Sequence, residues 1–197
     1  MWLVVGLGNP GSQYARNRHN VGFRVLDLVG QRWGASSSSW KEKFSGLWTK
    51  ASFAGEEVVL LAPQTYMNLS GESVQKAMTF FKVPLENVLV LHDELDLPWK
   101  EVRIKLGGGH AGNNGIRSIM QHCGADFVRV RIGIGKPPRG TTESWVLGDF
   151  DAMESAELPN VLSAAALAAE EVLQVGVAKA MNRVHGKGKQ PKPGKAE

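Results

Sequence analysis

The first 22 residues constrain the fold more than any other stretch of the chain. The apolar run Trp2 to Val5 predicts a buried strand, and the glycine-rich turn Gly6–Gly11 follows it directly. A few residues later, His19 precedes a segment in which apolar side chains recur at helical spacing. A strand, a tight turn and a helix in this order indicate an α/β protein that presents polar side chains at the carboxyl end of a strand.

The same turn fits the letters of the G-x-G-x-x-G fingerprint of dinucleotide-binding folds. In that fingerprint the last glycine opens a helix whose free N–H groups hold a pyrophosphate. Here Pro10 to Ser12 prolong the turn, and the helical pattern starts only near Asn20. The acidic residue that follows, Asp27, falls inside that helix rather than at the tip of a second strand. The sequence therefore argues against a nucleotide site.

The composition is that of an ordinary soluble globular protein. The chain has 197 residues, of which 43% are apolar and 21% charged, and this length suits one domain with a substantial core. It contains no apolar run long enough to span a membrane and no signal-peptide pattern at its start. Its single cysteine, Cys123, excludes an internal disulfide and a cysteine-based zinc site. We expect a cytoplasmic protein with Cys123 packed inside a helix.

The positive charge is concentrated at the end of the chain. The formal net charge is +4, and the four lysines and one glutamate after residue 185 supply +3 of it. We therefore expect a catalytic domain over residues 1–184 and a basic, disordered tail over 185–197. Because the body is nearly neutral, any nucleic-acid site must come from local clustering of basic residues.

Predicted strands and helices alternate along the chain, apart from one hairpin. Strands are predicted at 2–5, 47–53, 57–62, 87–92, 102–106 and 127–134, with the hairpin formed by the second and third of these. Helices are predicted from about 20 to 33, 69 to 81, 115 to 123 and 159 to 184. This order predicts an α/β fold: a single domain with a twisted mixed β-sheet flanked by helices.

Polar residues stand where predicted strands or loops give way to helices. The candidates are Asn9, His19, Asn68, Asp93 and the pair Asn113 and Asn114. Each has an alternative structural explanation: Asn68 and Asn114 could be helix N-caps, His19 could flank its helix, and Asp93 could be a solvated charge. Their shared position favours a site, because ligands of open α/β sheets bind outside the carboxyl ends of the strands.

Together these residue types suggest hydrolysis of an acyl bond by water. A neutral histidine can take a proton from water, and a carboxylate on its other nitrogen stabilises the imidazolium. Asparagine amides can donate to a developing oxyanion. The sequence contains neither a G-x-S-x-G elbow nor an H-E-x-x-H metal motif. A metal-dependent hydrolase using His92, Asp93 and Glu94 is a weaker alternative, because neighbouring strand residues point to opposite faces.

Five segments resemble motifs of the bacterial-type peptidyl-tRNA hydrolases, in that family's order. They are Gly6–Gly11, His19–Gly22, Pro63–Gly71, His92–Leu97 and Gly107–Gly115, and the segments 127–135 and 145–150 continue the match. The resemblance covers residues 1 to about 183 in one register. It implies hydrolysis of the ester between the carboxyl end of a peptide and the 3′-terminal ribose of tRNA, which recycles tRNA from stalled translation.

The resemblance also assigns roles to individual residues. His19 would be the general base and Asp93 its orienting partner. Substrate would be bound by Asn9, Tyr14, Met67, Asn68 and Asn114, and the 5′-phosphate end of the tRNA by Lys105 and Arg131. The resemblance implies a monomer that needs neither a metal nor a cofactor.

One position departs from the family pattern. The family loop commonly reads Gly-His-x-Gly-His-Asn-Gly, and here Asn113 replaces the second histidine. An asparagine keeps hydrogen-bonding capacity but cannot act as a base near neutral pH. An RNA-binding module of the same fold, like the splicing factors related to this family, is the alternative to an enzyme. Because a pure binder would be free to lose its base, the presence of His19 with Asp93 favours the enzyme.

Overall fold

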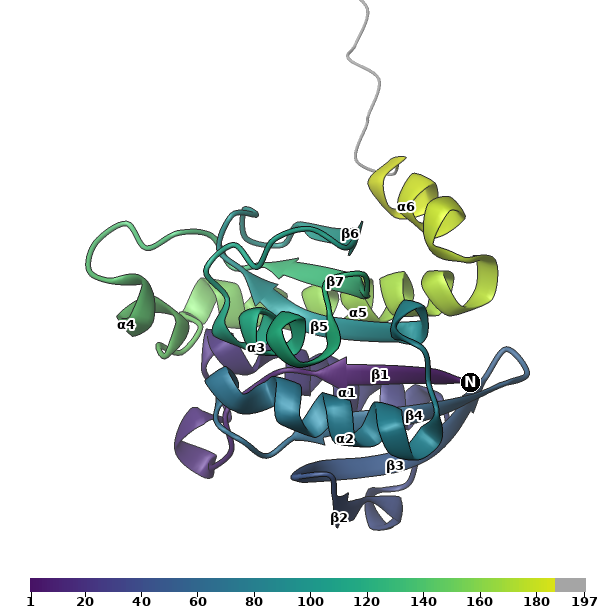
Figure 1. Ribbon diagram of the computed structural model, residues 1–197. Helices are drawn as coiled ribbons and strands as arrows, with labels where there is room; N and C mark the ends of the chain where they lie inside the picture. Colours follow the sequence, from purple (N-terminus) through teal and green to yellow (C-terminus); the bar gives the residue numbers. More distant parts are fainter. Residues whose placement is uncertain (187–197) are drawn as a thin grey trace, which may run out of the picture.

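The computed structural model describes residues 1–186 as a seven-stranded sheet covered by helices on both faces (Figure 1). The strands are β1 (Trp2–Gly6), β2 (Lys41–Lys43), β3 (Gly46–Phe53), β4 (Glu56–Pro63), β5 (Val88–Glu94), β6 (Val102–Leu106) and β7 (Val128–Gly133). The α-helices are α1 (Val21–Arg32), α2 (Ser70–Phe81), α3 (Asn114–Cys123), α4 (Thr142–Val146), α5 (Ala152–Val175) and α6 (Val177–Gly186). Short 3₁₀ turns include η1 (Ser12–Tyr14), η2 (Arg18–Asn20) and η4 (Met67–Leu69).

The sheet is mixed, as the sequence predicts. Its strand order is β2-β3-β4-β1-β5-β7-β6. The four central strands β4, β1, β5 and β7 run parallel, whereas β2, β3 and β6 pair antiparallel with their neighbours. The carboxyl ends of β1, β5 and β7 therefore lie at the same edge, on the left of Figure 1.

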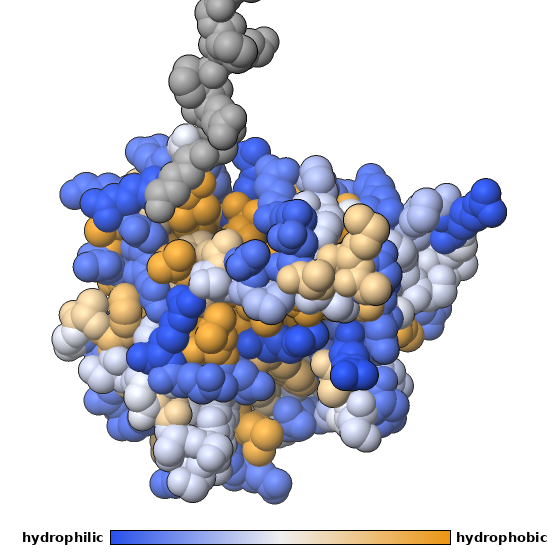
Figure 2. Space-filling view, turned by 180° about the vertical axis from the view of Figure 1, so that it is seen from behind, coloured by the Kyte–Doolittle hydropathy of each residue, from blue (hydrophilic) through white to orange (hydrophobic). Residues whose placement is uncertain are grey.

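Each central strand contributes side chains to two hydrophobic cores, one on each face of the sheet. Val4 packs with α1 and α5, while its neighbours Leu3 and Val5 pack with α2 and α3. This alternation follows from the two-residue period of a strand, and it explains why the central strands are continuous apolar runs. In Figure 1, α1 and α5 lie behind the sheet and α2 and α3 in front. The face behind the sheet is mostly hydrophilic on its outside, with hydrophobic spots separated by polar ones (Figure 2).

The hairpin and the buried strands were predicted within one or two residues, but three parts of the fold differ from the prediction, one of them the unpredicted five-residue helix α4. The short strand β2 was not predicted, since Lys41–Lys43 is wholly exposed and lacks an apolar pattern. The predicted helix 159–184 is two helices, because the chain turns at Gly176 with a φ of 83°. The first of the two, α5, begins before the predicted start, at a capping box formed by Asp151 and Glu154. Pro159, the predicted start, lies inside α5.

The second of these helices, α6, covers the open edge of the sheet beside β6 (Figure 1). The backbone N–H of Ile104 donates a 3.0 Å hydrogen bond to Nε2 of His185. His185 and Gly186 are therefore helical, although the sequence assigned them to the tail. The rest of the predicted tail, residues 187–197, lies outside the described residues.

Candidate active site

His19 and Asp93 meet at the carboxyl edge of the sheet, as the sequence predicts. His19 sits in η2, directly before α1, and Asp93 is near the end of β5. The Nδ1–H of His19 donates a 2.8 Å hydrogen bond to Oδ2 of Asp93. Both residues are buried, with 8% of His19 and 2% of Asp93 exposed. The pair therefore forms a dyad in which Nε2 is the imidazole nitrogen left to accept a proton.

Two opposing effects act on the pKa of His19. Burial lowers it, because the imidazolium loses its hydration. The negative charge of Asp93 and the hydrogen bond to that carboxylate raise it, and together they outweigh burial. The net pKa of His19 lies above its ordinary value of 6.5. The carboxylate therefore makes the imidazole a better proton acceptor than an isolated buried histidine would be.

The turn that carries Asn9 is closed by a second asparagine. The backbone N–H of Asn9 donates to Oδ1 of Asn20 over 2.8 Å, and Nδ2 of Asn20 returns a 2.9 Å bond to the carbonyl of Asn9. The side chain of Asn9 accepts a 2.8 Å bond from the backbone N–H of Met67. With its oxygen engaged, the amide nitrogen is the part of Asn9 that can donate to a substrate. Sequence reasoning gave Asn20 no role of its own.

The asparagine that caps α3 is Asn113 and not Asn114. Oδ1 of Asn113 accepts hydrogen bonds from the backbone N–H groups of Gly115 at 3.0 Å and Ile116 at 3.1 Å. Asn114 is the first residue of the helix and is exposed. Asn68 lies in η4, and no side chain caps α2. The N-cap interpretation is therefore wrong for both Asn68 and Asn114.

A cavity of about 510 Å³ opens beside the dyad. Its lining includes six of the predicted residues, namely Asn9, His19, Met67, Asn68, Asp93 and Asn114. Tyr14 does not line it and lies half-buried in η1. Asn113, which the sequence indicated beside Asn114, and Glu94, from the metal-site alternative, also line it. The other lining residues, which the sequence did not indicate, are Tyr66, Leu95, Ala111, Gly112, Thr142, Glu143, Val146 and Leu147.

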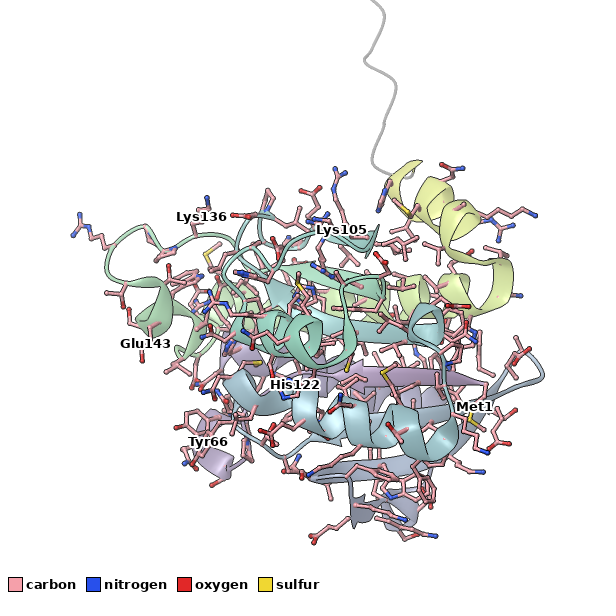
Figure 3. The ribbon with its side chains drawn as sticks, viewed as in Figure 1. Met1, Tyr66, Lys105, His122, Lys136 and Glu143 are labelled. Carbon is pink, nitrogen blue, oxygen red and sulfur yellow. The ribbon has the colours of Figure 1, made fainter. Side chains whose placement is uncertain are left out.

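The unselected lining comes mainly from α4 and from within the motif segments. Tyr66 and Glu143 both lie at the left end of the molecule in Figure 3, where the parallel strands end. Tyr66 and Leu95 fall inside segments that resemble family motifs, so their place in those segments was the available signal. Nothing in the sequence marked Thr142 or Glu143, because α4 spans only five residues.

A further cavity of about 590 Å³ lies between α1 and the start of α5. Its lining includes Arg16, Arg24 and Asp27 together with apolar residues of α5. None of the predicted site residues lines it. The polar groups suited to acyl chemistry are therefore gathered at the cavity beside the dyad.

Lys105 and Arg131 lie outside the cavity, on the last two strands of the sheet. The register pairs Arg103 with Arg131 and Lys105 with Arg129 on antiparallel neighbours. Residues paired in this way share a face, and so do residues two apart on one strand, so all four cations lie on one face. The residues between them, Ile104 and Val130, face the core on the other side. We refer to Arg103, Lys105, Arg129 and Arg131 as the cationic face.

Two members of this face are committed to protein contacts. Arg129 is buried and donates to the carbonyl oxygens of Gly109 and Gly108 at 2.6 and 2.8 Å, which holds the glycine-rich loop before α3. Arg103 pairs with Glu101. Within residues 1–186, neither Lys105 nor Arg131 forms an ion pair with a carboxylate. Lys105 and Arg131 are therefore the cations that could bind an external anion.

A family model described as Peptidyl-tRNA hydrolase matches residues 3–193. The chain belongs to the peptidyl-tRNA hydrolase family. A peptidyl-tRNA hydrolase from Sorangium cellulosum (strain So ce56) is 51% identical over 201 residues, an alignment that covers 100% of this chain and 88% of that protein. The peptidyl-tRNA hydrolase from Geotalea daltonii (strain DSM 22248 / JCM 15807 / FRC-32) is 45% identical, with 94% and 96% of the two chains covered.

Solved structures agree with the sequence relatives. The crystal structure of peptidyl-tRNA hydrolase from Acinetobacter baumannii matches with a TM-score of 0.86 and 39% identity, covering 93% of this chain and 94% of that one. The α/β architecture described above is therefore that of a peptidyl-tRNA hydrolase, and the resemblance read from the motifs is confirmed.

His92, the residue before Asp93, is held inside the protein by a hydrogen bond to the backbone. His92 is fully buried, and its Nδ1–H donates a 2.7 Å bond to the backbone carbonyl of Asp93. Burial lowers the pKa of His92 to about 4. Within the described part of the chain, no three His, Cys, Asp or Glu side chains are grouped closely enough to hold a metal ion.

No helix of residues 1–186 is both long and apolar enough to cross a membrane.

Proposed function

We propose that this family member hydrolyses the ester bond of peptidyl-tRNA, with His19 as general base and Asp93 as its orienting partner. The observation that carries the proposal is the 2.8 Å hydrogen bond between Nδ1 of His19 and Asp93, formed at the cavity wall. A carboxylate on Nδ1 fixes the tautomer in which Nε2 carries a lone pair. That lone pair is the group that would deprotonate a water molecule.

The proposed reaction is a direct attack of water on the ester carbonyl. Nε2 of His19 takes a proton from water as the hydroxide oxygen bonds to the carbonyl carbon, which generates an oxyanion. The amide nitrogens of Asn9, Asn68 and Asn114 are the donors proposed for that oxyanion and for the adjoining peptide. When the ester C–O bond breaks, the imidazolium returns the proton to the ribose oxygen. The products are a tRNA with a free terminal hydroxyl and a peptide carboxylic acid, which releases its remaining proton to solvent to become the carboxylate.

The cationic face is the surface proposed to bind the tRNA part of the substrate. Lys105 and Arg131 stand one strand apart on the same face, beyond α3, and Lys105 is labelled in the upper part of Figure 3. Neither forms an ion pair with a carboxylate of residues 1–186, so each can pair with a phosphate. We propose that they bind the 5′-phosphate end of the tRNA while its 3′ end enters the cavity.

The dyad and the proposed amide donors all come from one chain, so the proposed chemistry requires no second copy. We expect a monomer in solution, which sedimentation would test. Because its substrate arises at the ribosome, the proposed location is the cytoplasm. The proposed mechanism uses only side chains of this chain and no metal or cofactor, so turnover should survive a chelator.

The test is release of an N-acetylated amino acid from its tRNA ester by the wild type and by His19→Ala, each with and without EDTA. We expect turnover to fall by about 10²–10⁴-fold in the variant and to be unaffected by EDTA. His122→Ala is the matched control, because His122 lies on α3 and bonds the carbonyl of Ser118 instead of the dyad. Wild-type turnover in His19→Ala would refute the assignment of the base.

The same assay addresses the RNA-binding alternative. A wild-type protein that binds tRNA but releases no amino acid would be a binding module of this fold. The retained pairing of a histidine base with a buried carboxylate favours hydrolysis, since tRNA binding alone needs neither group.

A further inference from the structure

The amide of Asn113 makes contacts at both of its ends. Its oxygen accepts the backbone N–H groups of Gly115 and Ile116 at the start of α3. Its nitrogen lies 3.2 Å from Oδ1 of Asp93 and 3.2 Å from the backbone carbonyl of Asp93, and it donates to both. A single buried side chain therefore joins the amino end of α3 to the acidic member of the dyad.

The orientation of this amide follows from its partners. Two N–H groups of the helix face one end, so that end must be the carbonyl oxygen. A carboxylate and a carbonyl face the other end, so that end must be the NH₂ group. The reverse orientation would set donors against donors at α3 and an oxygen against the carboxylate of Asp93. The hydrogen-bond assignment is thus determined by chemistry that surrounds the side chain on both sides.

Both oxygens of the Asp93 carboxylate are consequently held. Oδ2 accepts from His19 at 2.8 Å, and Oδ1 accepts from Asn113 at 3.2 Å. A carboxylate bonded through one oxygen can rotate about its Cβ–Cγ bond, whereas one bonded through both is fixed in its plane. The plane of the carboxylate in turn sets the direction in which the imidazole of His19 is held.

We propose that Asn113 is a positioning residue for catalysis, which holds the Asp93 carboxylate so that Nε2 of His19 points at the attacking water. The inference rests on the proposed function of the dyad. Asn113 acts through Asp93 and transfers no proton itself. At the position where the family commonly has a histidine, this chain thus uses an amide to serve the helix and the dyad together.

The first test is Asn113→Ser. Serine is a good N-cap, so α3 stays capped, but its hydroxyl is too close to the backbone to reach Asp93. We expect kcat to fall about tenfold, as for loss of one hydrogen bond that orients a catalytic group, with KM and the melting temperature near wild type. Asn87→Ser is the matched control, because Asn87 donates to the carbonyl of Met1 at the far end of β5.

The second test is Asn113→Asp, which keeps the cap and the reach but replaces the donor with a negative charge. A second carboxylate beside Asp93 favours the imidazolium, so the acidic limb of the pH dependence of kcat/KM should move up by roughly one pH unit. An unmoved limb would overturn the proposal even if Asn113→Ser lost stability. Wild-type kcat in a folded Asn113→Ser, or a rise in KM alone, would overturn it too.

His19→Ala, measured in the same assay, separates this proposal from the function of the dyad. If His19→Ala keeps its turnover, the dyad itself is wrong. If His19→Ala loses turnover while Asn113→Ser retains wild-type kcat, the dyad stands and only the positioning role of Asn113 fails.

Discussion

The α-carbon of Gly22 lies against the backbone carbonyl of Leu91, so a Cβ at position 22 would sit 2.3 Å from that oxygen. It would also lie 2.7 Å from the backbone nitrogen and oxygen of Leu7. The first turn of α1 can therefore approach the ends of β1 and β5 only because residue 22 has no side chain. This approach brings His19, three residues earlier, within reach of Asp93, two residues after Leu91.

Gly22→Ala should therefore damage both stability and catalysis. The new methyl group must push α1 away from the sheet, which should cost about 1–3 kcal/mol in the free energy of unfolding and lengthen the His19–Asp93 hydrogen bond. Gly30→Ala is the control in the same helix, since a Cβ there meets only ordinary contacts of 3.5 Å or more. Gly30→Ala should stabilise by about 0.5–1 kcal/mol. Urea unfolding and turnover would check both, and equal behaviour of the two variants would contradict this account.

Asn9→Asp should distinguish the role of the Asn9 amide oxygen from that of its amide nitrogen. The carboxylate still accepts from the N–H of Met67, so the turn should keep its structure and the melting temperature should change little. It has no donor for an oxyanion, however, and turnover should fall by about 10²-fold or more. Asn9→Ala loses both functions and should also lower the melting temperature. Wild-type turnover in Asn9→Asp would show that Asn9 has no role as a donor.

Lys105→Ala should weaken tRNA binding in a salt-dependent way. Loss of one phosphate contact reduces the slope of log Kd against log salt concentration by about one. Lys50→Ala is the control, because Lys50 pairs with Glu57 on the hairpin at the other side of the sheet. Titration of tRNA between roughly 50 and 200 mM salt would measure both slopes. An unchanged slope in Lys105→Ala would exclude a phosphate contact at this position.

His19 and His92 should make the stability depend on pH in opposite directions. The pKa of His92 falls from 6.5 in the unfolded chain to about 4 in the fold, so below pH 6.5 the unfolded chain binds a proton that the native protein does not. Its contribution to stability is present above pH 6.5 and is lost as pH falls towards 4, by roughly 3 kcal/mol. Urea unfolding of His92→Asn across this range should show a shallower acid slope than the wild type.

For His19 the sign is reversed. Its native pKa is raised above 6.5, so the native protein holds the proton more tightly than the unfolded chain does. The stability from the His19–Asp93 pair is fully present below pH 6.5 and is lost as pH rises through the native pKa. In His19→Asn the free energy of unfolding should therefore no longer decrease above pH 6.5. It should still decrease at acid pH, because His92 is unchanged. A fall in His19→Asn as steep as in the wild type would contradict the raised pKa.

The sequence was sufficient for the parts of the fold and site that depend on short patterns. Continuous apolar runs marked the buried strands, and the glycine-rich turn Gly6–Gly11 marked the end of the first one. His19 and Asp93 could be paired because His19 precedes a helix and Asp93 follows a strand, and the sheet topology gathers both positions at the carboxyl ends of the parallel strands.

The parts that were missed depend on contacts between distant segments. Two asparagines stand side by side before α3, and only the position of Asp93 distinguishes Asn113 as the one that turns inward. The lining from α4 could not be predicted, because a helix of five residues has no measurable period. The break at Gly176 was missed because the Ala-rich pattern continues on both sides of it.

That break has a consequence for how the protein stays in solution. After Gly176 the chain turns back, and α6 lies along β6, where His185 takes up a backbone N–H of this last strand. An uncovered edge strand offers unpaired backbone groups to other chains and promotes aggregation. Since α6 contributes no residue to the cavity, a chain cut before it should keep every proposed catalytic group, but it would expose β6 and the core around Ala180 and should self-associate. The proposed catalytic groups and the helix that protects the sheet edge therefore belong to different parts of the fold.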